Sequence, residues 1–138
     1  MTRALAVGMA LLAAAAVHAN DDCAARLNSA QPVLRAEAEG YTVAFVPVPA
    51  PLATGQHFAL DIAVCPGAGA APPTALRVDA DMPAHRHGMN YRPSVAARGA
   101  GLYRAEGLLL HMPGRWRFIF DLAFDGRIAR VIREVDVP

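Results

Sequence analysis

The feature that most constrains the fold is a two-residue alternation of apolar and polar side chains that returns along the chain. It is clearest over residues 57–65, where apolar side chains occupy every second position from Phe58 to Val64. This period is typical of β-strands with one buried face, because successive side chains of a strand point to opposite faces. The same pattern predicts further strands over residues 41–46, 76–82, 102–111, 116–124 and 129–137.

Short stretches rich in proline and glycine separate these segments. Pro113-Gly114 and Asp125-Gly126 are strong marks of tight turns. The prolines at positions 47–51 and 83–93 are expected to end strands, because proline has no amide hydrogen for a strand ladder. Helical periodicity is weak and confined to residues 23–34. The sequence therefore predicts an all-β domain, an immunoglobulin-like antiparallel β-sandwich of six to seven strands, with a small closed barrel as the alternative.

The first 19 residues have the composition of a secretory signal peptide. Arg3 supplies the positive charge, residues 4–17 are apolar, and the chain becomes polar at residues 20–22. This apolar run is shorter than the roughly 20 residues of a transmembrane helix. We expect cleavage after Ala19 and a periplasmic or secreted protein with no stable membrane insertion, a retained anchor being the alternative. The expected organisation is a signal-peptide helix over 1–19, an N-terminal lead-in over 20–40 and the sandwich domain over 41–138.

Charge and motif content exclude several classes of protein. In residues 20–138, 12 arginines balance 12 acidic residues and there is no lysine, so the chain has no basic stripe for nucleic acid. Glycine-rich phosphate loops are absent from the sequence, and neither Ser29 nor Ser94 lies in a nucleophile-elbow pattern. We therefore expect no nucleic-acid partner and no catalysis.

The chain has two cysteines, Cys23 and Cys65. In an exported protein an even pair favours a disulfide. It would close a loop of about 40 residues and contribute roughly 3–4 kcal/mol in the chain-entropy model. A thiolate metal site is the alternative, although neither cysteine has a Cys or His at ligand spacing nearby.

Methionine and histidine are concentrated in two short segments, residues 82–89 and 111–112. Thioether sulfur is a soft donor that selects Cu(I), and imidazole suits both copper and zinc. A mixed set without carboxylates therefore favours copper over zinc, magnesium or calcium. In a sandwich the two segments could meet at one end of the sheets, where loops cluster. His57 opens a strand and is expected to bind no metal. The candidate ligands are Met82, His85, His87, Met89, His111 and Met112.

Each candidate also has a simpler interpretation. Met82 continues an apolar strand face and would then be a core residue. His111 and Met112 are adjacent, so on a regular strand only one of them would face a site. His85 and His87 flank Arg86, and this segment could be an exposed polar loop.

Three stretches carry a resemblance to a known family: residues 81–90 with Met-Pro-x-His-x-His-Gly-Met, residues 101–108 with Gly-x-Tyr-x-Ala, and residues 111–116 with Met-Pro-Gly-x-Trp. Together they resemble the YtkA-like/FixH-like domain of exported bacterial proteins, over residues 40–137. The resemblance implies an immunoglobulin-like β-sandwich. It also implies a role in copper handling or in the assembly of copper-containing respiratory oxidases. The six candidate ligands named above are the motif residues that carry over.

Three functional hypotheses follow. The first is a periplasmic protein that binds copper, as Cu(I), and delivers it to a membrane or periplasmic protein. The second is an assembly module for a membrane respiratory complex with no metal of its own, whose methionines serve as adaptable apolar contacts. The third is a copper monooxygenase with His18 as its mature N-terminus, which would require cleavage after Val17, a position that favours small residues.

Overall fold

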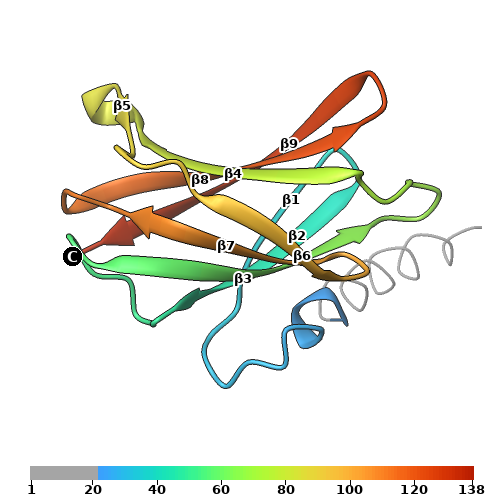
Figure 1. Ribbon diagram of the computed structural model, residues 1–138, viewed down its shortest axis with the longest axis horizontal. Coiled ribbons are helices and arrows are strands. Elements are labelled where there is room, and N and C mark those ends of the chain that lie inside the picture. The colour runs from blue at the N-terminus through green and yellow to red at the C-terminus, as the bar shows by residue number, and fades with distance from the viewer. Residues whose placement is uncertain (1–21) are drawn as a thin grey trace, which may run out of the picture.

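The computed structural model describes residues 22–138 of the chain. The predicted signal-peptide helix, residues 1–19, and His18 lie outside the described residues. Residues 22–138 form nine strands in two antiparallel sheets that lie face to face (Figure 1). Strand pairing within the described chain stays inside each sheet. The immunoglobulin-like sandwich is therefore confirmed, and the closed barrel is wrong.

The five-stranded sheet has the order β1-β2-β3-β7-β6, and the four-stranded sheet has the order β5-β4-β8-β9. The first consists of β1 (Leu34–Ala38), β2 (Tyr41–Val48), β3 (His57–Pro66), β7 (Leu102–Leu109) and β6 (Ser94–Gly99). The second consists of β5 (His87–Gly88), β4 (Ala75–Met82), β8 (Gly114–Phe124) and β9 (Arg127–Val137). A short 3-10 helix, η1 (Pro83–His85), connects β4 to β5, and residues 22–25 form one helical turn.

The core lies between the sheets and is built from the inward faces that the alternation predicts. Phe45 of β2 meets Phe118 and Phe120 of β8 with ring centroids 5.4 and 4.9 Å apart. All three rings are fully buried, as is Trp116 further along β8. Buried aromatic rings contribute the largest apolar areas, so this group of side chains anchors one sheet on the other.

Three of the nine strands, β1, β5 and β6, were not predicted; they are the three shortest, with five, two and six residues. Every residue of β6 is exposed or half-buried, and β5 has two residues. Strand β1 pairs with β2 from Leu34–Phe45 to Ala38–Tyr41, so the boundary placed at residue 40 falls between two paired strands. Strand β2 continues past Pro47 to Val48, beyond the end of its pairing with β1. The weak helical periodicity of residues 23–34 yields the single helical turn over 22–25.

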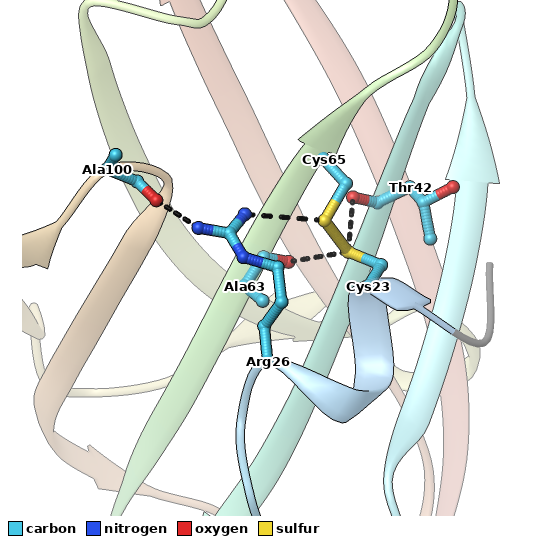
Figure 2. Close-up of a disulfide and its surroundings, with 6 residues drawn as sticks. All are labelled: Cys23, Arg26, Thr42, Ala63, Cys65 and Ala100. Carbon is cyan, nitrogen blue, oxygen red and sulfur yellow. Dashed lines mark hydrogen bonds between the residues drawn. A yellow bond between two sulfur atoms is a disulfide. The ribbon is translucent and has the colours of Figure 1, made fainter. Parts of the chain in front are cut away.

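A disulfide joins Cys23 to Cys65, as predicted, so the alternative of a thiolate metal site is wrong (Figure 2). It fastens the helical turn to the outer side of the five-stranded sheet, where Ala44 and Ala63 are buried beneath it. Arg26 lies beside the disulfide, with Nη1 3.6 Å from the sulfur of Cys65 and Nη2 donating to the Ala100 carbonyl. The disulfide thus secures one end of the sandwich.

The disulfide and the methionine- and histidine-rich segments lie near opposite ends of strand β3. Strand β3 begins at His57, which pairs with Leu109 at the end of β7, and Cys65 lies near its other end. The connection from β7 to β8, residues 110–113, crosses between the sheets at the His57 end. Figure 1 shows β5 at the upper left and the helical turn at the lower right, beneath the five-stranded sheet. Within residues 22–138, no helix is long and apolar enough to cross a membrane.

Candidate metal site

The hairpin of β4 and β5 positions the first pair of candidate ligands. Alternation along β4 ends with Met82, which is 2% exposed. The chain then turns through η1, with Pro83 at its first position, and leaves it through Arg86 in the left-handed region at φ 52°. In β5, His87 pairs directly with Met82. Because paired residues of antiparallel strands project on the same side, Met82 and His87 share the inner face of the sheet.

The loop 110–113 brings the second segment against the first. The ring centroids of His87 and His111 are 4.9 Å apart, with an interplanar angle of 34°. Trp116 packs edge-on against both imidazoles, 5.7 Å from His87 and 5.5 Å from His111. Its indole N–H donates to the carbonyl oxygen of Met112 at 3.0 Å, which holds the loop over the end of β8. The two histidines, far apart in sequence, therefore form one cluster on a buried tryptophan.

Each imidazole of this pair has a buried nitrogen without a hydrogen-bond partner in the described residues: Nε2 of His87 and Nδ1 of His111. Unsatisfied buried polar atoms are rare because each costs roughly 1–3 kcal/mol, and a bound ion is one of their explanations. Nδ1 of His87 lies 3.3 Å from the Gly88 carbonyl oxygen, and because a carbonyl can only accept, this contact is a hydrogen bond in the tautomer that carries its proton on Nδ1. Nε2 then carries the free lone pair, as in histidine metal ligands oriented by a backbone carbonyl.

The remaining candidates surround this pair at different depths. His85, on η1, is exposed, and its ring centroid is 5.8 Å from that of His87. Met89 and Met112 are half-buried and pack against the hydrophobic core. The methyl group of Met82 occupies the space over Gly114, where an added Cβ would lie 2.6 Å from it. The structure thus joins His85, His87 and His111 by ring contacts and Met82 by strand pairing, and it places Met89 and Met112 at the margin of the core.

Carboxylates do not contribute to this cluster. Within residues 22–138 no group of three or more His, Cys, Asp or Glu side chains could hold a metal ion. Asp81, next to Met82, projects to the outer face of the sheet, where Arg117 donates to both of its oxygens at 2.8 and 2.6 Å. An ion bound at the cluster would therefore need thioether sulfur beside imidazole nitrogen.

His57 lies at the same end of the sandwich but on the other sheet. It is exposed at the start of β3, and its ring meets that of Tyr91 edge-on with centroids 5.1 Å apart. It therefore provides a matched control histidine, close to the cluster but outside it.

Two residues that help to build this cluster, Trp116 and Gly114, are not identified by the sequence analysis. Trp116 is a fully buried core residue that also supports both imidazoles. Gly114 was interpreted as a turn residue, but it begins β8 and leaves room for Met82. Their position directly after His111 and Met112 was the available signal.

Comparison with protein families gives one match. The model of the YtkA-like family matches residues 35–121, from β1 to within β8, a span that contains all six candidate ligands. Comparisons with curated proteins and with solved structures give no significant match.

Proposed function

This chain belongs to the YtkA-like family, and on that premise we propose that it is an exported copper protein that carries Cu(I) and delivers it to a membrane or periplasmic partner. The observation that supports this most directly is the pair of buried, unpartnered imidazole nitrogens of His87 and His111. Met82 pairs with His87 across the β4–β5 hairpin, and Met89 and Met112, close by in sequence, lie at the margin of the core.

The donor set accounts for the choice of metal. Imidazole and thioether are neutral ligands, so a bound Cu(I) ion introduces a single positive charge and no buried carboxylate. Thioether sulfur favours Cu(I), whereas zinc sites take three or four ligands from Cys, His, Asp and Glu. A group of three or more such residues is absent from the described part of the chain. The protein therefore serves as a carrier of Cu(I), and catalysis is not part of the proposal.

The disulfide supports the cellular location. Disulfides persist in oxidising compartments such as the bacterial periplasm and are rare in the cytosol. The Cys23–Cys65 bond is therefore the cross-link expected of an exported domain. A periplasmic carrier also fits the signal-peptide composition of residues 1–19.

The test is an anaerobic competition between the protein and a chromogenic Cu(I) chelator. We expect one Cu(I) per chain, bound more tightly than Zn²⁺. Replacing both His87 and His111 by Ala should weaken Cu(I) binding at least about 100-fold, since even the loss of an outer-shell partner costs roughly 10–100-fold.

The matched control is His57→Ala, which removes an exposed imidazole at the same end of the sandwich. Its Cu(I) affinity should equal that of the wild type. Equal affinity of the wild type and the double variant, or no Cu(I) binding by the wild type, would contradict the proposed function.

A further inference from the structure

The six candidate ligands differ in exposure, and one of them stands apart. Met82 is buried, while His87, Met89, His111 and Met112 are half-buried. His85 is the exposed member of the set. A ligand on the surface can meet an incoming ion or a partner before the buried donors can.

The three imidazoles form a row that runs inward from His85. Its ring contacts that of His87 at 5.8 Å, and His87 contacts His111 at 4.9 Å. His87 is thus the middle member, between the exposed ring of His85 and the half-buried ring of His111. The row connects solvent with the cluster.

The backbone holds His85 at the outer end of this row. It closes η1, which starts at Pro83, and the following residue, Arg86, adopts the left-handed conformation and donates its N–H to the Pro83 carbonyl at 3.2 Å. Proline fixes its own φ, so a turn built in this way has few alternative conformations. His85 is therefore presented on a defined turn, where little ordering is needed when a ligand binds.

We propose that His85 is the exchange ligand of the site: Cu(I) enters and leaves the buried cluster through a transient bond to this imidazole. This inference rests on the proposed function. In loading, a bond from copper to His85 forms while a bond from copper to its donor breaks; the bond to His85 then breaks as bonds to Nε2 of His87 and Nδ1 of His111 form. The copper remains Cu(I) throughout, and no proton is transferred because the neutral imidazole binds through its lone pair.

The chemistry of the exchange also defines the partner. A protein that loads or unloads this site offers a soft or imidazole donor, such as a Met or His side chain, to the surface around η1. Copper is then never without ligands, and the partner's donor need not reach the buried nitrogens. The exchange ligand consequently affects loading and unloading rates equally, and leaves the equilibrium constant, their ratio, nearly unchanged.

The experiment compares rate with affinity in the full exported chain. Protein preloaded with Cu(I) is mixed anaerobically with a chromogenic chelator in a stopped-flow instrument, and the reverse transfer from the chelator complex is measured separately. His85→Ala should slow both directions about tenfold, a change of roughly 1.4 kcal/mol in the barrier. Its equilibrium affinity should stay close to that of the wild type, and His85→Met, which restores a Cu(I) donor at the same position, should recover the rate.

The control variants separate the possible outcomes. His57→Ala should leave both rate and affinity unchanged, whereas His87→Ala should lose affinity. The inference is overturned if His85→Ala exchanges copper at the wild-type rate, or if it loses affinity as His87→Ala does, which would make it a resident ligand. If the wild type binds no Cu(I), the proposed function fails as well, and the equilibrium titration shows this before any rate is measured.

Discussion

At the scale of the residue, Met82 combines two roles. It is 2% exposed and belongs to the main hydrophobic core. It also lies opposite His87 on the inner face of the β4–β5 hairpin, with its methyl group over Gly114. Leucine is similar in volume and has no sulfur, so one substitution separates packing from copper binding.

We predict that Met82→Leu leaves the fold intact and weakens Cu(I) binding. Volume-conserving swaps of this kind usually cost less than about 1.5 kcal/mol of unfolding free energy. Loss of the thioether donor should lower the affinity about tenfold, or roughly 1.4 kcal/mol of binding free energy. Urea unfolding of the apo protein and the anaerobic chelator competition measure the two quantities. A stable variant with wild-type affinity would restrict Met82 to the core.

The sequence identifies the types of the candidate ligands better than their arrangement. Their spacing of two would put His85 and His87 on one face of an extended segment, but η1 and the left-handed Arg86 lie there, and the rings meet across a turn. His111 and Met112 were placed at the end of a strand, whereas they lie in the loop after β7. That loop is fixed by the hydrogen bond from Trp116 to the Met112 carbonyl, a contact that side-chain periodicity does not encode.

At the scale of the element, the strands that the sequence predicts best are those with one face in the core. Strands β3, β4 and β8 carry regular alternation because each has one face in the core, and the sequence predicts them closely. Strands β1, β5 and β6 are the three shortest strands of the described chain, with five, two and six residues, so each offers few positions from which a period can be recognised. The candidate ligand His87 belongs to β5, a strand that exists because η1 folds the chain back onto β4.

The outer face of β8 and β9 carries ion pairs between neighbouring strands. Arg130 donates to both oxygens of Asp121, at 2.7 and 2.9 Å. The Asp121 side chain is 17% exposed, and that of Arg130 is 56% exposed. The hydrogen bonds from Arg130 hold the pKa of Asp121 below its ordinary value of 3.8, more strongly than burial raises it.

We predict that Asp121→Asn reduces the loss of stability in acid. A carboxylate with a depressed folded-state pKa contributes stability that is present above its unfolded pKa, near 3.8, and disappears as pH falls through the lower folded value. At neutral pH the variant should lose up to about 1 kcal/mol of unfolding free energy, because Arg130 is largely solvated. Urea unfolding from pH 7 down to pH 2 measures the difference.

Asp125→Asn is the matched control for this prediction, because Asp125 is exposed in the turn between β8 and β9 and Asn-Gly is as favourable a turn as Asp-Gly. Its stability should follow the wild-type pH dependence. If Asp121→Asn also follows the wild-type curve at every pH, the ion pair contributes nothing to acid sensitivity.

At the scale of the whole molecule, the stabilising disulfide and the candidate site lie near opposite ends of strand β3. Strand β3 has 10 residues and therefore spans roughly 30 Å. The disulfide and the helical turn lie at its Cys65 end, while its His57 end is beside the loop that carries His111 and Met112. The candidate site borders the core between the sheets, whereas the disulfide belongs to a separate small cluster with Ala44 and Ala63 on the outer side of the five-stranded sheet, so the two share no ligand.

We predict that removing the disulfide lowers stability and leaves copper binding unchanged. The bond links residues 42 positions apart, and a loop of that length contributes about 4 kcal/mol in the chain-entropy model. The double variant Cys23→Ala/Cys65→Ala is preferable to chemical reduction, because free thiols and thiol reductants themselves bind Cu(I). Urea unfolding should show the loss, and the chelator competition, run where the variant is still folded, should give the wild-type affinity. A folded variant with weakened Cu(I) binding would show that the two ends are coupled through the core.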